Sequence, residues 1–536
     1  MLDSLGKLVQ LVKIRRARIP NIVPSNVNPP DPSTHQTPQK RNLAVTGVML
    51  VIFLFAIDAT IVSTAMPTIV ARLGGLELYS WVFSIYMLTS ALTTPLFGKL
   101  SDLFSRRRLM LIGIGIFVLG STLCGAAQSM EMLVLFRAVQ GLGGGAIYAL
   151  SFILVGILFP PETRARMQGF ISSVWGLASI LGPLAGGIIV ENWSWRWAFF
   201  VNLPITAVAS ALIVIGLKEE KAIRHAHRLD LKGAVVLLLG LLLIFYALAE
   251  SSQSMRPVNP ETIGLVALAL VILFVFLVIE RRAEEPMIPL DLFHLSLFRT
   301  STCVATLASM GVFGAVTYLP LYLQGVIGLS ASRAGMVLLL LSLGWTAGSL
   351  LAGQAINRRG YRFVSTTGMV LMALGYGLFV IHKSNVSLPS VLISAILIGV
   401  GMGFANLATL VAAQNGVWFQ RIGVATSTLM LFRTFGGAFS VSLLGTVLLN
   451  QMQQNLSRMK DGGAVSGLLD KLANPQNLLE PATRAQIPVE LLPKLTAVLA
   501  DSIWYAFATA FALMLIGLVV SLSLGHYTPA DTPRPK

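Results

Sequence analysis

The chain has a repeating hydrophobic pattern, in which long apolar runs alternate with short polar segments from about residue 43 to residue 524. Runs of about 20 apolar residues predict membrane-spanning helices, because 20 helical residues cover the roughly 30 Å of a bilayer's hydrocarbon core. A strand barrel would instead show short segments of alternating polarity. The sequence therefore predicts an all-α membrane protein with fourteen transmembrane helices. The predicted segments lie near residues 43–66, 79–98, 109–128, 132–157, 167–190, 197–217, 233–249, 261–279, 300–323, 333–353, 363–381, 388–412, 424–449 and 503–524.

The composition agrees with a membrane protein. Of the 536 residues, 55% are hydrophobic and only 12% are charged, whereas a soluble domain has roughly 25% charged residues. The net charge of +16 does not indicate a nucleic-acid partner, since the basic residues cluster at the ends of apolar runs. The two cysteines, Cys124 and Cys303, offer neither a disulfide framework nor metal-ligand spacing. We expect no metal, no cofactor and no enzymatic activity, because the apolar runs hold no cluster of catalytic or ligating side chains.

The distribution of basic residues predicts the orientation. If the N-terminus is cytoplasmic, the short outer loops hold few Lys and Arg and the short inner loops hold many, as membrane topology favours. Both termini are therefore expected in the cytoplasm of a cell whose inner or plasma membrane holds the chain. The outer set is Arg72, Arg196, Arg256, Arg333 and Lys383, and the inner set includes Lys99, Arg106, Arg107, Arg108, Arg164, Arg166, Arg358 and Arg359.

Three segments lie outside the predicted spans. Residues 1–19 combine apolar residues at helical spacing with basic ones, which fits a short helix on anionic lipid or a disordered basic tail. Residues 20–40 are rich in Pro, Asn, Ser and Thr and are expected to be disordered. The loop 450–502 is expected outside, and its amphipathic pieces, 465–473 and 489–500, predict short helices on the membrane surface.

A loop motif occurs twice and predicts two related halves. The stretch "GKLSDLFSRRR" follows the second segment, and "GQAINRRGYR" follows the tenth. Each has a glycine, an acid or amide four residues later, and then basic residues. Repeated halves are typical of transporters, so we expect two six-helix pseudo-symmetric bundles with two inserted helices between them. The predicted parts are an N-terminal tail (1–42), an N-terminal bundle (43–217), the inserted pair with its loops (218–298), a C-terminal bundle (299–525) and a C-terminal tail (526–536).

Asp58 stands in an apolar run that has no other charge from Leu43 to Met66. A charge at the centre of a membrane helix costs about 2.5–3.5 kcal/mol, so such a residue is usually paired or faces a cavity. Arg137 lies at a similar predicted depth in the fourth segment, which makes a buried ion pair plausible. Burial favours the neutral form of a carboxylic acid and a nearby arginine favours the charged form. A substrate that alters either influence would move a proton, although a purely structural ion pair is the alternative.

Arg433 is the other charge that the sequence places inside a span, nearer the inner side. The sequence contains no Asp or Glu between Asp291 and Asp461. Arg433 could extend its charged end toward lipid headgroups, hydrogen-bond backbone carbonyls, or contact an anionic substrate. The sequence does not choose among these roles.

The motifs together resemble those of the major facilitator superfamily, over about residues 43–450. The loop after the second segment resembles the superfamily signature, and "LFRAVQGLGGGA" resembles its fourth-helix motif. "GLASILGPLAGG" resembles the fifth-helix motif of its antiporters, while "IDATIVSTAMP" and "WRWAFFVNLP" resemble its fourteen-helix drug:proton antiporter branch. The second copy of the loop motif departs from this pattern, because it has Asn357 where an acid is expected, so a gating salt bridge would be weaker there.

The resemblance implies a multidrug efflux antiporter, associated with antibiotic resistance, that exports small amphiphilic or lipophilic compounds in exchange for protons by alternating access. The alternative is an exporter of a lipid or native metabolite on the same fold, for which the loop 450–502 could guide the lipid or meet a periplasmic adaptor. A channel is disfavoured by the fifth-helix motif, and an ATP-driven pump by the lack of a Walker motif.

The residues expected to carry this function form four sets. Asp58 and Arg137 are the proton-coupling pair. The inner gate is assigned to Gly98, Asp102, Arg106, Arg107, Arg108, Gly353 and Asn357. In the fifth helix Gly182 and Gly186 form a small-xxx-small face for close packing, and Pro183 permits a kink; Gly187 completes that motif. The substrate cavity is assigned to Tyr86, Gln140, Tyr148, Trp175, Tyr318, Gln324, Trp345 and Asn406.

Overall fold

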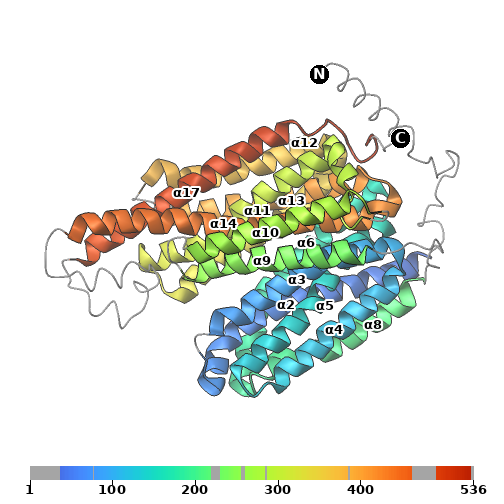
Figure 1. Ribbon diagram of the computed structural model, residues 1–536, viewed down its shortest axis with the longest axis horizontal. Coiled ribbons are helices and arrows are strands. Elements are labelled where there is room, and N and C mark those ends of the chain that lie inside the picture. The colour runs from blue at the N-terminus through green and yellow to red at the C-terminus, as the bar shows by residue number, and fades with distance from the viewer. Residues whose placement is uncertain are drawn as a thin grey trace. The chain divides into compact units, whose positions relative to one another are not determined.

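In the computed structural model every regular element of the described residues is a helix (Figure 1). The described residues are 37–75, 78–218, 230–254, 260–283, 286–383, 387–460 and 491–532. The predictions for residues 1–19 and 465–473 lie outside these ranges. Helices are the expected outcome for this sequence, because a membrane-spanning backbone must satisfy its own hydrogen bonds.

The first half of the chain forms six long helices and one short one. Its helices are α2 (Pro38–Leu73), α3 (Tyr79–Leu103), α4 (Arg106–Ala126), α5 (Met130–Leu158), α6 (Pro161–Asn192), α7 (Trp197–Phe200) and α8 (Asn202–Gly216). We call the side of the membrane at which α2 begins and α17 ends the terminal side, and the other the far side.

The rest of the chain consists of a helical pair followed by the second half. Its helices are α9 (Leu231–Ser254), α10 (Pro260–Glu280), η3 (Leu290–His294), α11 (Ser296–Gly325), α12 (Ala331–His382), α13 (Leu388–Asn415), η5 (Phe419–Arg421), α14 (Ile422–Lys460) and α17 (Leu492–Leu522). The pair α9–α10 packs through α9 against α3 and α14, and so it covers a seam between the two halves (Figure 1).

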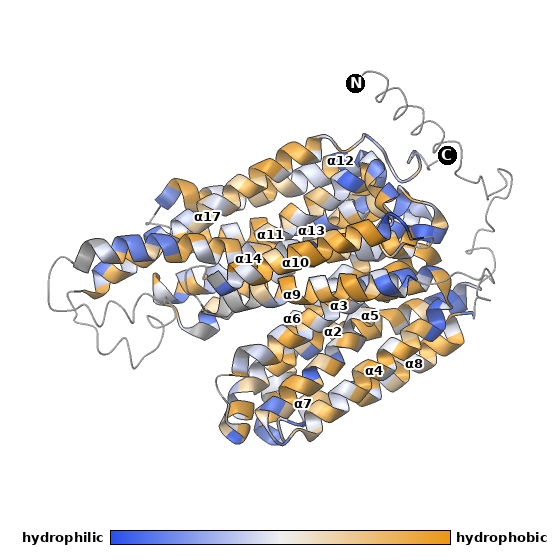
Figure 2. Ribbon diagram, viewed as in Figure 1, coloured by the Kyte–Doolittle hydropathy of each residue, from blue (hydrophilic) through white to orange (hydrophobic). Residues whose placement is uncertain are grey.

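Eleven helices of the described residues are long and apolar enough to cross a membrane, and α9 contains a shorter apolar stretch. Hydrophobic residues occupy the middle of the helices and polar residues gather at their ends (Figure 2). The helix α3 is not among the eleven. It carries a band of hydroxyl side chains, of which Ser90 and Thr93 donate hydrogen bonds to the carbonyls of Gly141 (3.0 Å) and Leu142 (3.1 Å) in α5.

Several of the predicted boundaries are wrong. Residues 38–40 were expected to be disordered but form the first turn of α2, and residues 450–460 were expected in the outer loop but continue α14. The first helix was expected to end at Met66, but α2 continues through Pro67 and ends before Gly74, whose φ of 72° breaks the helical pattern. An interior proline removes one backbone hydrogen bond, a loss that membrane helices tolerate. The segment 489–500 was expected to form a surface helix. Its residues from Leu492 onward instead form the start of α17, because Leu495 and Leu499 pack into the core of the second half.

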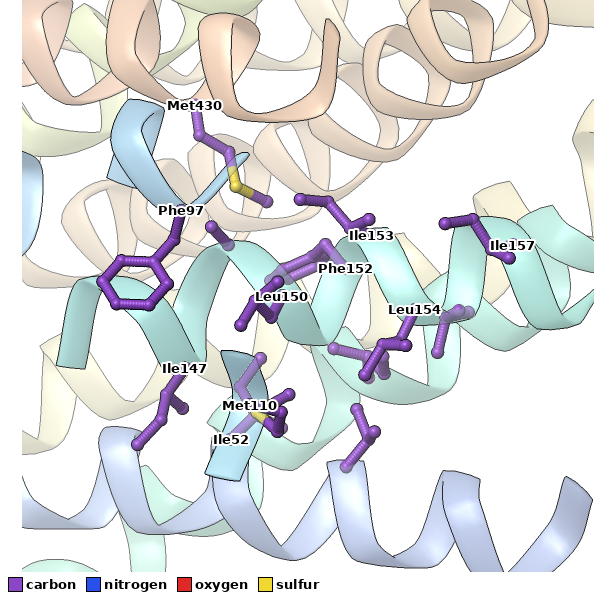
Figure 3. Packing of buried hydrophobic residues seen from close by; sticks show 14 of the residues in the cluster. Ile52, Phe97, Met110, Ile147, Leu150, Phe152, Ile153, Leu154, Ile157 and Met430 are labelled. Atoms are coloured by element: carbon purple, nitrogen blue, oxygen red, sulfur yellow. The ribbon is translucent and has the colours of Figure 1, made fainter. Parts of the chain in front are cut away.

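Each half has its own apolar core. In the first half α5 is the most enclosed helix, and its aliphatic residues pack against α2 and α4 (Figure 3). Met430 of α14 belongs to the same cluster and lies near Ile153 of α5, so the second half contributes to this core from across the interface (Figure 3). Side-chain packing of this kind holds membrane helices together, since lipid offers no hydrophobic driving force.

The chain turns sharply inside α12, which spans two of the predicted segments. Gly360 has φ 76° and ψ 172°, and the helical conformation resumes after it. The C-terminal segment after α17 lies against this turn. The backbone N–H of Tyr361 donates to the carbonyl of Tyr527 at 3.0 Å, and the Tyr361 hydroxyl lies 3.1 Å from the Thr532 hydroxyl. A side chain at position 360 would be both strained and crowded, because its Cβ would lie only 2.7 Å from that carbonyl oxygen.

Candidate functional site

Asp58 and Arg137 form an ion pair between α2 and α5. The Arg137 Nη1 lies 2.6 Å from the Asp58 Oδ2, and neither side chain is exposed. A buried ion pair needs further hydrogen bonds for its remaining polar atoms. Amide side chains supply them to the carboxylate here, whereas the Arg137 Nη2 atom has no hydrogen-bond partner among the described residues. Gln140 donates to the Asp58 Oδ1 at 2.8 Å and Asn202 donates to it at 3.0 Å, so three donors surround one carboxylate.

The surroundings of the pair fix its geometry. Arg137 donates from Nη1 to the side-chain amide oxygen of Gln140 (2.8 Å) and from Nε to the backbone carbonyl of Val82 (3.3 Å). Asn202 also donates to the hydroxyl of Ser121 at 2.9 Å. The site therefore gathers side chains from α2, α4, α5 and α8, and we call Asp58, Arg137, Gln140, Asn202 and Ser121 the carboxylate cluster.

Aromatic rings connect the carboxylate cluster to a wider region. The Tyr86 ring lies 4.0 Å from the Arg137 guanidinium carbon, in cation–π geometry. Phe55 contacts Tyr86 (5.8 Å between ring centroids) and stacks on Tyr148 (5.4 Å). Trp175 meets both Phe55 and Tyr148 edge-on. Tyr86 and Phe55 are buried, whereas Tyr148 and Trp175 are partly exposed, which makes the last two the accessible end of the aromatic row.

Sequence reasoning missed Asn202 and Ser121. Each is a polar residue in a largely apolar predicted span, as Asp58 is, and this was the available signal. The face to which each side chain points depends on helix packing, so the sequence did not show that they converge. Tyr86 and Gln140 were assigned to a substrate cavity. The structure places them beside the ion pair, where both are at most 1% exposed.

On the terminal side, Asp102 of α3 caps the start of α14. Its two carboxylate oxygens accept the backbone N–H groups of Gly423 (2.9 Å) and Val424 (2.8 Å). A carboxylate at a helix N-terminus satisfies unpaired N–H groups and is favoured by the helix dipole. Gly98 makes this contact possible, because a Cβ at that position would overlap the hydroxyl of Ser427.

The second loop copy makes a related contact between α12 and α6. Here the side chain donates the hydrogen bond, whereas Asp102 accepts in the first copy. The Asn357 amide donates to the backbone carbonyl of Glu162 at 2.6 Å. A Cβ on Gly353 would lie 2.9 Å from the carbonyl of Ala165, so the glycine again allows close approach. Two similar contacts thus join the two halves at the terminal side. Only the first of them has a carboxylate on a helix N-terminus.

Other polar contacts also join the halves near these helix ends. Arg164 of α6 donates a hydrogen bond to the side-chain amide oxygen of Asn415 in α13. The amide nitrogen of Asn415 donates to the Tyr361 hydroxyl at 2.7 Å. Gln168 donates to Gln414 at 3.2 Å. Of the basic loop residues, Arg107 donates to the backbone carbonyl of Leu217 at 3.4 Å. Arg106 lies over the ring of Phe419 at 5.9 Å, and Arg108 is exposed.

The glycines of α6 face α2. A Cβ on Gly182 would overlap the Thr60 hydroxyl, and one on Gly186 would overlap the Thr64 hydroxyl. The Thr60 hydroxyl also reaches the backbone carbonyl of Ala178 in α6, at 3.3 Å. In contrast, a Cβ on Gly187 would meet nothing within 4 Å. Pro183 lies inside α6, which remains helical on both sides of it.

A comparison with protein-family models shows the family to which the chain belongs. The model of the Major Facilitator Superfamily matches residues 48–441. The chain belongs to the major facilitator superfamily. Proteins of this superfamily are membrane transporters and not enzymes, so the chain is a multi-pass transporter. The match runs from α2 through the α9–α10 pair into α14.

Relatives in this superfamily are named for drug transport. The chain is 34% identical over 507 residues to the multidrug transporter protein MdtP of Bacillus subtilis (strain 168), which covers 90% of this chain and 93% of that relative. It is 33% identical over 485 residues to multidrug resistance protein 3 of the same organism, at 90% and 94% coverage.

A solved transporter structure has the same fold. The crystal structure of the human organic anion transporter MFSD10 (TETRAN) has a TM-score of 0.61 and 16% identity, with 91% of this chain and 100% of that chain covered. At this level of identity the likeness concerns the fold.

The remaining cavity candidates are dispersed in this major facilitator fold. Tyr318 is buried in the core of the second half, where its hydroxyl donates to the backbone carbonyl of Val441 at 2.5 Å. Gln324 and Trp345 are partly exposed, and Asn406 is 6% exposed with its side-chain oxygen unpaired. Among the eight candidates, the structure joins Tyr86, Tyr148 and Trp175 through contacts with Phe55.

The two loop copies give a prediction about gating. Asp102→Ala and Gly98→Leu are expected to reduce transport by at least tenfold, because the first exposes the N-terminus of α14 and the second separates α3 from α14. Asn357→Ala, the matched change in the second copy, should reduce it by roughly threefold or less, since it removes one neutral hydrogen bond. The measurement is the initial rate of substrate uptake into proteoliposomes with equal protein content. Equal losses at Asp102 and Asn357 would show that the two contacts share the gating load.

Proposed function

We propose that the chain is a proton-coupled exporter of amphiphilic or lipophilic small molecules, of the fourteen-helix drug:proton antiporter branch. It would work by alternating access in the cell (inner or plasma) membrane with both termini in the cytoplasm. The observation that carries the proposal is the carboxylate cluster, a fully enclosed Asp58 with three donors in the middle of a transport fold. The names of the relatives, which refer to multidrug transport and resistance, support small-molecule export.

The carboxylate cluster suits proton coupling because its hydrogen bonds depend on the charge of Asp58. A neutral carboxylic acid accepts less strongly from Arg137, so protonation would loosen α2 from α5. Conversely, a movement of α2 that drew Asp58 away from Arg137 would favour proton uptake. One proton moving inward across 100 mV supplies about 2.3 kcal/mol from the membrane potential. This energy would drive one export step.

The contacts between the halves support alternating access. The cap of Asp102 on α14 and the contact of Asn357 with α6 join the halves on the terminal side, which is the cytoplasmic side in this proposal. Hydrogen bonds of Arg164, Gln168 and Gln414 also cross between the halves near these helix ends. These contacts support a state closed toward the cytoplasm, and export would require them to break and re-form in each cycle.

A count of fourteen crossings is supported by the form of α12. Its break at Gly360 separates two apolar stretches, 333–353 and 363–381, that would cross the membrane in opposite directions. The remaining two would be α3, with its hydroxyl band turned toward α5, and α9, the shorter apolar helix. An even number of crossings places both termini on the same side.

The decisive experiment uses inverted membrane vesicles that contain the full chain. An imposed pH gradient, acid inside, should drive uptake of a fluorescent amphiphile such as ethidium, and a protonophore should abolish this uptake. Uptake that proceeds equally without a gradient would contradict proton coupling. Uptake of labelled lipids but of no tested drug would favour a lipid exporter on the same fold.

A further inference from the structure

Arg433 lies inside α14 without a partner for two of its nitrogens among the described residues. Its side chain is 7% exposed, and the Nε and Nη1 atoms have no hydrogen-bond acceptor. It is 11 residues from the start of α14 at Ile422, so it is about 16 Å into the membrane from the terminal side. At this burial the guanidinium does not reach lipid headgroups, and no carbonyl accepts from its two buried nitrogens. Two of the three roles that the sequence left open are therefore excluded in this state.

Among the described residues, no carboxylate forms an ion pair with Arg433. Asp58 already accepts from Arg137, Gln140 and Asn202. Asp102 already accepts the N–H groups of Gly423 and Val424. In the second half the sequence has no Asp or Glu between Asp291 and Asp461, and Asp501 of α17 accepts a hydrogen bond from Asn455 at 3.2 Å. A buried charge without a counter-ion is unfavourable, and such a residue in a membrane helix marks a functional site.

Arg433 faces the first half of the chain. Leu429 and Met430, one turn earlier in α14, pack into the cluster around α5, and Figure 3 shows Met430 there. Tyr148 of α5 packs against the same cluster. Tyr148 is 11 residues beyond Arg137 in α5, so Tyr148 and the carboxylate cluster are about 16 Å apart along that helix.

The neighbours of Tyr148 are suited to the apolar part of a ligand. Tyr148 and Trp175 are the partly exposed end of the aromatic row, with their ring centroids 6.5 Å apart. Aromatic side chains of this kind bury apolar surface and stack on planar groups. A guanidinium beside them offers planar N–H donors that match carboxylate, sulfonate or phosphate groups.

We propose that Arg433, with Tyr148 and Trp175, forms a subsite for amphiphiles that carry a single negative charge on an apolar, preferably aromatic, body. The proposal rests on the proposed export function for its setting, and it names one class of ligand that this subsite would take beside the other compounds exported. The anion neutralises Arg433 as it binds, and Tyr148 and Trp175 hold its apolar body. The negative group could belong to a small carboxylate or to an anionic lipid headgroup, and the chemistry at Arg433 is the same for both.

The test measures binding and needs no proton gradient, so it is independent of proton coupling. Dansylglycine is the anionic probe and dansylglycinamide is its neutral match. Binding to the purified full chain in phosphatidylcholine nanodiscs is followed by energy transfer from tryptophan to the dansyl group. The wild type is expected to bind dansylglycine about tenfold more tightly than the amide, as expected for a charge-assisted contact. Equal affinity for the two probes would overturn the proposal.

The variants assign the preference to one side chain. Arg433→Met should bind the two probes equally, and Arg433→Lys should retain part of the preference, because it keeps the charge but loses the planar donors. Arg421→Met is the control, since Arg421 is an exposed arginine paired with Asp291 near the start of the same helix. A preference that persists in Arg433→Met would overturn the assignment. If Arg433→Met does not fold, loss of part of the preference in Arg433→Lys decides, and an unchanged preference there counts against the proposal.

A lipid arm distinguishes the sources of the anion. Nanodiscs that contain half phosphatidylglycerol replace those of phosphatidylcholine alone. Weaker binding of dansylglycine to the wild type, with no change in Arg433→Met, would identify a lipid headgroup as a competing occupant of the same subsite. Unchanged binding would identify the small carboxylate amphiphile as the occupant.

Discussion

Exchange of Asp58 for asparagine is expected to abolish gradient-driven export, with a loss of at least a hundredfold in initial rate. The asparagine side chain keeps the size of the aspartate and can still accept from Gln140 or Asn202, but it cannot carry a proton between the two sides. Loss of the charge leaves Arg137 buried and unpaired, and breaking a buried pair costs about 3–5 kcal/mol. The measurement combines ethidium uptake in inverted vesicles with the unfolding temperature of the purified variant.

A double variant separates the loss of coupling from the loss of stability. Asp58→Asn with Arg137→Gln removes both charges, so no charge is left unpaired. We expect its unfolding temperature to recover toward that of the wild type while gradient-driven transport remains absent. Full transport by the single Asp58→Asn variant would end the assignment of proton coupling to Asp58. Recovery of transport in the double variant would make the ion pair structural only.

Exchange of Gly182 for leucine is expected to cause the second largest effect, a loss of transport of at least tenfold together with proton leak. Even the first carbon of a side chain would overlap the Thr60 hydroxyl of α2, so α2 and α6 would have to separate. Close packing of small residues is a main source of cohesion between membrane helices. Alanine at Gly182 or Gly186 should be tolerated poorly. The measurement is proton leak into proteoliposomes without substrate.

The same helix provides the control. Gly187→Leu adds equal bulk one residue beyond Gly186, where nothing lies within 4 Å of the added carbon, and it should behave like the wild type. Thr60→Ala should partly rescue Gly182→Ala, since it removes the hydroxyl that the new methyl group would strike. Normal transport without leak in Gly182→Leu would show that the contact between α2 and α6 is not a seal.

The helices and the pairing of Asp58 with Arg137 could be anticipated from the sequence for simple reasons. The length of an apolar run predicts a membrane span. A single carboxylate and a single arginine at similar depth in the membrane have few other charged groups with which to pair. The limits of the helices were harder to predict. The end of α2 depends on how membrane neighbours compensate for Pro67, and the start of α17 depends on whether Leu495 finds a core to pack against.

The rest of the carboxylate cluster required three-dimensional information. Asn202 and Ser121 lie 144 and 63 residues from Asp58 in sequence numbering, and only the rotation of α8 and α4 brings their side chains to it. The lack of a partner for Arg433 is also a property of the assembled fold. A sequence shows that no acid lies nearby along the chain, but it does not show that Asp58 and Asp102 are already occupied by other donors.

The contact between the C-terminal segment and the turn at Gly360 has a consequence for the way this chain tolerates change. Tyr527 is recognised there through its backbone carbonyl, which any amino acid can supply. The identity of residue 527 therefore matters less than its distance from the end of α17 at Leu522. Substitutions in this segment should be better tolerated than insertions or deletions, which shift the carbonyl away from the N–H of Tyr361. An affinity tag is accordingly better appended after Lys536 than inserted between residues 523 and 527.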